Sequence, residues 1–302
     1  MSAFSLVLGM GFGLPGSVPA ACAVLSLDER TGTIGLFRPA DPVRRDSLAV
    51  HLASDPLLAD SRLRLIALTA PLTPRPLERK PWRARAVEIR LSRGTFASSL
   101  RGPNMPWISR AHSWSRYEQA LGPFEILQAR GFPLLAIPAE APAAELPLRC
   151  TAEVFPKASL AVLGPRTALL SRPGANEFLG HLDDWLFPQL FTAPERGSPP
   201  IEARLAVLVP GLRLAPEVLD EVRRIANLRR PDPRRAPLRA FLAAFQGVLA
   251  LCGGACLVGA AGDHEGSVLL PSLWHPEWET EWSDFRREVP ELRRVPVNVH
   301  PR

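Results

Sequence analysis

The sequence has few cysteines, only two lysines and no long uninterrupted apolar run, and each shortage narrows the classes of protein to consider. Four cysteines in 302 residues are too few and too widely spread for a disulfide framework, so we expect a reduced, cytoplasmic protein. Cys252 and Cys256 are four residues apart, but no second Cys or His pair at zinc-finger spacing accompanies them. These two residues are therefore predicted to be small packing residues.

The apolar stretch at residues 4–24 resembles a signal peptide only superficially. No Lys or Arg precedes it, and glycines and prolines interrupt it too often for a helical segment. No later stretch is long and apolar enough to span a bilayer. We therefore expect a cytoplasmic protein with no membrane partner.

The positive charge is carried almost entirely by arginine. The formal net charge is +6 and the isoelectric point is about 9.9, a balance that suits a polyanion such as DNA or RNA. Lys80 and Lys157 are the only lysines, and the arginines are scattered rather than gathered in one block. The charge is therefore compatible with nucleic-acid contact and equally with a bias in coding composition.

Two common catalytic motifs do not fit the chain. The spacing Gly9-x-Gly11-x-Gly13 resembles a dinucleotide-binding loop, but such a loop must open a helix whose N-terminus faces the pyrophosphate. Here Pro15 and Pro19 lead into another apolar run instead. A Gly-x-Ser-x-Gly elbow is absent, so a serine hydrolase of that kind has no support.

The first part of the chain predicts an antiparallel meander of three strands, because three short apolar runs are separated by turn-forming residues. The runs are 4–8, 20–27 and 33–37. Residues 42–54 have helical spacing, and the compact apolar run at 63–68 predicts a buried strand.

Helices and strands are expected to alternate after residue 68. The patterns predict helices at 83–92, 114–129, 177–185, 217–228 and 237–251, and strands at 133–138, 149–155, 255–258 and 267–270. We therefore expect an α/β domain over residues 1–271, in which helices flank a mixed sheet. The Pro- and Gly-rich segment at about 192–216 is expected to be an insertion or a flexible crossover.

The tail, residues 272–302, carries three tryptophans spaced by four residues, Trp274, Trp278 and Trp282. Such side chains can stack on nucleic-acid bases, or they can pack a C-terminal segment onto its own domain. The acidic residues between them would repel phosphate, so we expect packing.

Five short strings, in a fixed order, resemble the motifs of a family of bacterial and archaeal proteins that are predicted to be nucleases. The strings span residues 9–13, 68–72, 85–88, 153–156 and 262–266, and the helix that begins near Arg239 and a strand that closes at Pro271 complete the pattern. The resemblance covers roughly residues 4–271. It implies a ribonuclease H-like mixed sheet, in which the antiparallel three-strand meander is followed by alternating helices and strands.

Nucleases of this kind hold carboxylates at the ends of the central strands, because two divalent cations about 4 Å apart must be clamped there. At the positions where the family carries aspartate, this chain has Gly11, Thr69 and, at or near the last one, Arg239. Glycine and arginine cannot hold a cation, and threonine is a weak neutral ligand. The sequence therefore predicts a degenerate, catalytically impaired site in a protein that acts by binding nucleic acid or a protein partner.

Two acids leave an alternative open. Glu153 at a strand end and Glu88 on a helix could meet in the same cleft, which would give an active nuclease with Mg²⁺ or Mn²⁺ bound by Glu153. An ion pair of Glu153 with Lys157 or a nearby arginine is the structural alternative, because a buried carboxylate needs a partner. A structural or assembly role without nucleic acid is the third hypothesis.

The same region supplies the candidate contacts to a phosphate backbone, which are Arg83, Arg85, Arg90, Arg93 and Lys157. The four arginines fall on one short predicted helix, for which a solvated face is an equally good interpretation. Asp263 and Glu265, in the turn at 262–266, are expected to serve the geometry of a hairpin.

Overall fold

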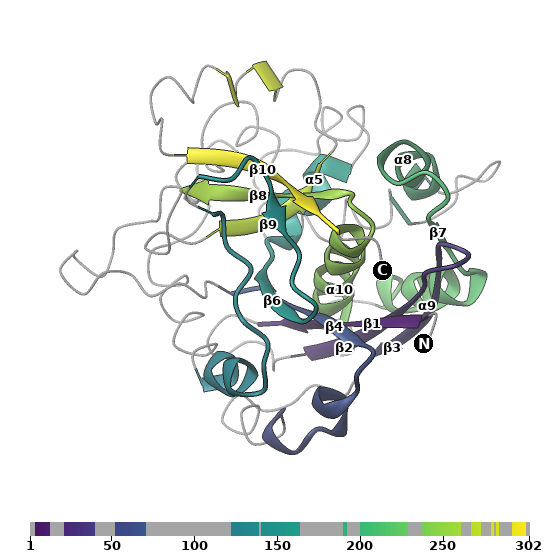
Figure 1. Ribbon diagram of the computed structural model, residues 1–302. Coiled ribbons are helices and arrows are strands. Elements are labelled where there is room, and N and C mark those ends of the chain that lie inside the picture. Colours follow the sequence, from purple (N-terminus) through teal and green to yellow (C-terminus); the bar gives the residue numbers. More distant parts are fainter. Residues whose placement is uncertain are drawn as a thin grey trace, which may run out of the picture.

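The protein is an α/β structure in which one central helix lies between two sheets (Figure 1). The computed structural model describes residues 4–12, 21–39, 52–70, 122–138, 140–163, 190–191, 200–228, 237–260, 267–272, 279–280, 282–283 and 292–299. Among these residues no helix has the length and apolar character needed to cross a bilayer.

The larger sheet has six strands in the order β6-β4-β1-β2-β3-β7. They are β1 (Phe4–Gly11), β2 (Ala21–Asp28), β3 (Thr33–Pro39), β4 (Leu63–Leu68), β6 (Cys150–Glu153) and β7 (Arg213–Leu214). The pairs β1–β2 and β2–β3 are antiparallel, whereas β1–β4, β4–β6 and β3–β7 are parallel. The predicted meander and the buried strand at 63–68 are therefore confirmed.

A tight turn makes the second hairpin of the meander possible. The carboxylate of Asp28 accepts a hydrogen bond from the backbone N–H of Arg30 at 2.9 Å. Gly32 has a φ of +63°, a left-handed conformation that costs a glycine nothing, and its N–H returns to the Asp28 carbonyl at 2.9 Å. The turn chemistry of residues 28–32 thus fixes the register of β2 and β3.

Helix α10 (Pro237–Leu251) has the bounds that the sequence predicts, and nearly all of it is buried. It packs on β1, β2 and β4 of the larger sheet and on β9 of the smaller one. A Cβ atom added to Gly9 would lie 1.9 Å from the carbonyl oxygen of Ala240 and 2.6 Å from the nitrogen of Ala244. Helix and strand therefore touch backbone to backbone, which only small residues allow.

The two faces of the larger sheet belong to different hydrophobic cores. On the α10 side, Val7, Leu65 and Ala67 join a core that includes the stacked rings of Phe241 and Phe245. On the other side, Leu8, Met10, Ile66 and Leu68 pack with Phe124, Leu127 and Phe132. Both faces are covered, which explains why β1 and β4 are continuous apolar runs rather than alternating ones.

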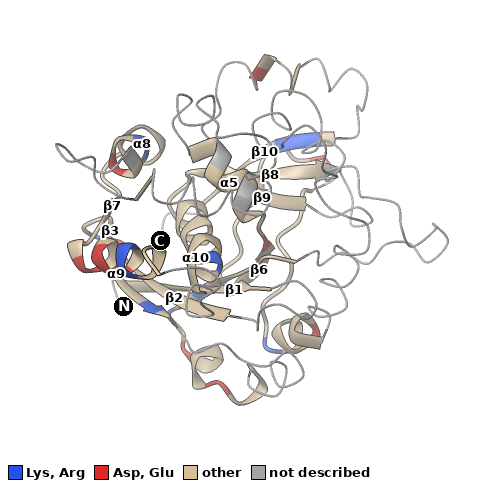
Figure 2. Cartoon of the chain, turned by 180° about the vertical axis from the view of Figure 1, so that it is seen from behind, with Lys and Arg blue, Asp and Glu red and all other residues tan. Residues whose placement is uncertain are grey.

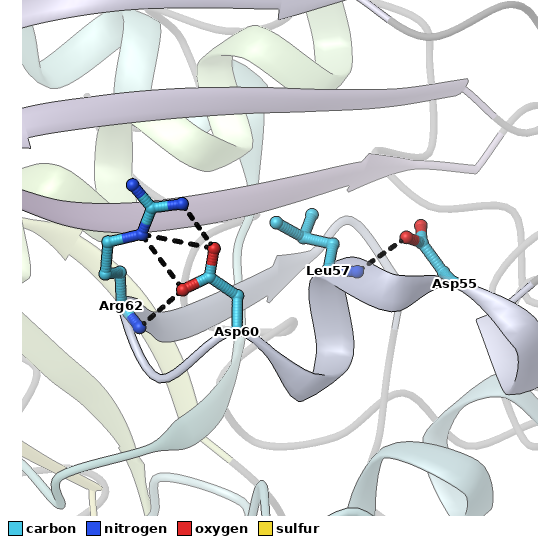
Figure 3. Close-up of polar contacts among 4 residues, drawn as sticks. All are labelled: Asp55, Leu57, Asp60 and Arg62. Atoms are coloured by element: carbon cyan, nitrogen blue, oxygen red, sulfur yellow. Dashed lines mark hydrogen bonds and ion pairs between the residues drawn. The ribbon is translucent and has the colours of Figure 1, made fainter.

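A short capped turn leads the chain into β4 (Figure 3). The Asp55 carboxylate accepts a hydrogen bond from the Leu57 N–H at 2.9 Å and so caps η1 (Pro56–Ala59). The Asp60 carboxylate accepts hydrogen bonds from the backbone and the guanidinium of Arg62, the shortest at 2.7 Å from Nη2. The Arg62 side chain is also the main reason that the pKa of Asp60 is lowered.

The smaller sheet has four strands in the order β5-β10-β8-β9. They are β5 (Ala144–Glu145), β10 (Leu292–Asn298), β8 (Ala255–Ala260) and β9 (Ser267–Pro271). An isolated bridge between Val154 and Leu269 joins the end of β6 to this sheet. Strand β10 comes from the tail and was not predicted.

The tail contributes packing as well as a strand. Trp282 is 5% exposed, and the guanidinium of Arg294 lies 5.9 Å from the centre of its ring. Arg294 also forms a two-pronged ion pair with Glu279, with a shortest distance of 2.6 Å. Trp282 is thus held inside the protein and is not presented to bases, whereas Trp274 and Trp278 lie outside the described residues.

Two segments differ from the sequence-based expectation. Within 192–216 the structure has α8 (Pro200–Leu208) and β7, which extends the larger sheet beside β3. The predicted strand at 133–138 is reduced to a single bridge between Leu134 and Thr151. Pro133 and Pro138 lack the N–H groups that a longer ladder would need.

The remaining described helices follow the predicted pattern in part. Helix α9 (Pro216–Ala226) buries one face, Val218, Leu219, Val222 and Ile225, and agrees with the prediction for 217–228. Residues 122–129 are helical, as expected for the end of the helix predicted at 114–129, and α5 (Pro156–Leu163) follows β6. Figure 2 shows both acidic and basic residues on α9, where the acidic residues come first along the helix and Arg223 and Arg224 lie in its last turn.

Candidate functional site

The carboxyl ends of β1, β4 and β6 meet at one edge of the larger sheet, because these three strands are parallel neighbours. Met10 pairs with Leu68, and Leu68 pairs with Glu153. Thr69 directly follows β4, and Gly11 ends β1. An edge of this kind is where α/β proteins commonly place ligands.

Helix α10 begins over the same edge. A Cβ atom added to Gly11 would lie 3.1 Å from the Cβ of Arg239 and 3.1 Å from the backbone nitrogen of Ala240. The backbones of Gly11, Thr69, Arg239 and Glu153 therefore lie at one edge of the larger sheet. The first turn of α10 lies close to Gly11, so a Cβ atom at this position would require α10 to shift by a few tenths of an ångström.

Thr69 makes two hydrogen bonds that join the ends of β1 and β4 at this edge. Its side chain is 8% exposed, and its hydroxyl oxygen accepts a hydrogen bond from the Phe12 N–H at 2.8 Å. The Thr69 N–H in turn donates to the Met10 carbonyl at 3.0 Å. These two bonds continue the pairing of β1 and β4 one step beyond the strands.

Replacing Thr69 with valine removes the hydroxyl that accepts the hydrogen bond of the buried Phe12 N–H. We expect Thr69→Val to lower the free energy of unfolding by about 1–2 kcal/mol, measured by urea denaturation. Thr69→Ser keeps the acceptor and should recover most of the loss. Equal stability of the valine variant and the original protein would contradict this role.

Glu153 lies at the same edge, but its side chain points to the face of the larger sheet that is opposite α10. Its register partner Leu68 packs in the core away from α10, whereas Ala67 and Ala152, one residue earlier, pack on the α10 side. Paired residues of parallel strands point to the same face, and successive residues alternate between faces. The Glu153 side chain, which is 5% exposed, is therefore on the face opposite to Gly11 and Arg239.

The other sequence-predicted site residues lie outside the described residues, except for the backbone of Lys157. Glu88 lies outside the described residues, as do the acids of the turn at 262–266. Of the candidate phosphate contacts, Arg83, Arg85, Arg90 and Arg93 also lie outside them. The backbone of Lys157 belongs to α5, but its side chain is not described.

The described groups at this edge do not form a two-cation site. Mg²⁺ and Mn²⁺ prefer several oxygen ligands from carboxylates. Among the described residues this edge has the carboxylate of Glu153 on one face and the basic residue Arg239 on the α10 side. The Thr69 oxygen already accepts a backbone hydrogen bond. Over the whole described part of the chain, no three His, Cys, Asp or Glu side chains gather as metal ligands.

The cysteines are packing residues in the structure, as predicted for Cys252 and Cys256. Burial raises the pKa of the thiols of Cys22, Cys150, Cys252 and Cys256 to about 12. They are therefore protonated at neutral pH, and a thiol in that state is a poor nucleophile and a poor metal ligand.

The contact that shapes this site, the close packing of β1 against α10, was not predicted from the sequence. The sequence does contain residues that indicate this contact. Gly9 and Gly11 lie on one face of a strand, and Ala240 and Ala244 are one turn apart on a helix. Glycines at alternate strand positions indicate close approach of another backbone. No protein-family model, no curated protein and no solved structure matches the chain.

Proposed function

We propose that the protein is a ribonuclease H-like domain that has lost metal-dependent nuclease chemistry and acts by binding, with nucleic acid as its ligand. Arg239 carries the proposal, because the Cβ atom of this basic residue lies beside Gly11, at a position where a nuclease needs anionic ligands for its metal ions. The strand order supports the fold assignment, since an antiparallel meander is followed by parallel strands on one side.

The chemistry of the edge favours binding over hydrolysis. Hydrolysis of a phosphodiester through two metal ions needs converging carboxylates, and the positions that correspond to them hold glycine, threonine and arginine. The net charge of +6 favours association with a polyanion. Arg83, Arg85, Arg90, Arg93 and Lys157 are the proposed contacts to the phosphate backbone.

A cleavage assay tests the loss of catalysis. Labelled single- and double-stranded DNA and RNA are incubated with the protein and Mg²⁺ or Mn²⁺, and we expect no cleavage above that of the buffer. Cleavage that disappears in Glu153→Gln would overturn the proposal. That result would instead favour the second candidate function, a nuclease with a rearranged carboxylate set that includes Glu153 and Glu88.

A binding assay tests the ligand. We expect the affinity for nucleic acid to fall steeply with salt, because each neutralised phosphate contributes about 0.9 to the slope of log K against log salt for duplex DNA. Replacing Arg83, Arg85, Arg90 and Arg93 with alanine should weaken binding at least about tenfold and flatten that slope. The measurement is fluorescence anisotropy at a series of salt concentrations.

The matched control removes the same charge elsewhere. It replaces four exposed arginines of the described residues, Arg30, Arg38, Arg130 and Arg213, with alanine. Equal losses in both variants would mean that only net charge matters and would contradict a defined contact surface. No binding even at low salt would leave a protein partner, or a structural and assembly role, as the function.

A further inference from the structure

Gln246 is a polar side chain in an otherwise apolar setting. It lies in the second half of α10, is 1% exposed, and is the one polar residue among the thirteen buried residues of this fully described helix. The following residue, Gly247, faces Val7 and Leu65 so closely that a Cβ atom would lie 2.7 Å from each. Since a helix turns about 100° per residue, Gln246 lies on the flank of α10, about 100° around the helix from the side that faces β1 and β4.

The amide of Gln246 needs partners that the described protein groups do not supply. It has one acceptor oxygen and two N–H donors, and both Oε1 and Nε2 are buried without a hydrogen bond to any described residue. Leaving a buried amide unbonded is costly, because water satisfies it in the unfolded chain. A leucine or methionine of similar size would avoid that cost.

Other buried hydroxyl groups of the described core already donate hydrogen bonds to backbone carbonyl groups. The Ser159 hydroxyl donates to the Phe155 carbonyl at 3.3 Å, and the Ser267 hydroxyl donates to the Leu135 carbonyl at 3.3 Å. Thr151 likewise donates to the Phe132 carbonyl at 3.2 Å. Because Oε1 accepts and Nε2 donates, a single ligand that satisfies this amide must itself donate and accept hydrogen bonds.

We infer that Gln246 binds an internal water molecule on the flank of α10. Water is small enough for a tightly packed core, donates and accepts hydrogen bonds, and commonly satisfies buried groups of this kind in globular proteins. The helix itself offers further acceptors, because each carbonyl oxygen keeps a second lone pair after its helical hydrogen bond. This site does not depend on the proposed function.

The experiment combines a crystal structure with a pair of variants. We expect an ordered solvent peak within about 3.2 Å of an amide atom of Gln246. Gln246→Met removes the groups that hold the water, and its melting temperature should fall by about 2–4 °C, as a loss near 1 kcal/mol produces in a large domain. Gln128→Met, at an exposed helical position, is the control and should leave the melting temperature unchanged.

Two results would overturn the inference. One is a crystal structure in which Oε1 and Nε2 of Gln246 contact only protein groups or no polar group at all. The other is a rise in the melting temperature of Gln246→Met, because methionine stabilises the protein only if it replaces a dry, unbonded amide.

Discussion

Gly9→Ala is expected to destabilise the protein by roughly 3 kcal/mol or more, because the added methyl group has no room. Its carbon would lie 1.9 Å from the Ala240 carbonyl oxygen and 2.9 Å from the Ala240 carbonyl carbon. These are backbone atoms, so no side-chain rotation can relieve the overlap, and α10 must move away from β1. Urea denaturation followed by tryptophan fluorescence measures the loss.

Gly35→Ala is the matched control in the same sheet. Among the described residues, a Cβ atom at Gly35 would come within 4 Å of the Ser26 hydroxyl oxygen alone, at an ordinary distance of 3.7 Å. We expect its free energy of unfolding to change by no more than about 0.5 kcal/mol. If both glycine variants were equally stable, the close packing of α10 on β1 would be refuted.

Phe241→Ala is the second substitution for which we expect a large loss. The Phe241 ring is fully buried, and its centre lies 4.9 Å from that of Phe37, 5.4 Å from that of Phe191 and 5.9 Å from that of Phe245. Truncation removes the shared partner of three rings and opens a cavity between α10 and β3. The expected loss is about 3–5 kcal/mol, measured by the same denaturation experiment.

Phe4→Ala provides the comparison for Phe241. Phe4 begins β1 and is 48% exposed, so it gives up less buried area than Phe241 and leaves no closed cavity. We expect a loss of less than about 1 kcal/mol. A loss for Phe241→Ala as small as that for Phe4→Ala would show that the aromatic cluster does not form.

Elements defined by local signals were predictable from the sequence. Helix α10 begins with a proline at its first position and continues as a long apolar run, and its predicted bounds agree with the structure. The hairpin of β2 and β3 follows from the turn residues between Asp28 and Gly32. Both depend on neighbours within a few residues in the chain.

Elements defined by distant partners were not predictable. Strand β10 contains two arginines and Pro296, a composition unlike that of an inner strand, and only its pairing with β8 and β5 makes it one. The 192–216 segment is rich in proline, but β3 provides an edge on which β7 forms. Tertiary pairing outweighed local composition in both cases.

The candidate site was predictable in position but not in orientation. The motifs placed Gly11, Thr69 and Glu153 at strand ends and Arg239 at the start of a helix, and these residues do share one edge. Which face each side chain takes depends on the register of β4 with β6, since a shift by one residue reverses it. The pairing of Leu68 with Glu153 fixes that register and separates the acid from Arg239.

The position of β10 has a consequence for the order of events during synthesis. Strand β8 pairs with β9 on one side and with β10 on the other, and β10 is the last of the described strands to be translated. Until residues 292–298 leave the ribosome, the backbone of β8 presents an open edge to which any extended chain can add. The smaller sheet is therefore completed only after β10 has been synthesised, whereas the meander of β1, β2 and β3 can pair as soon as it emerges.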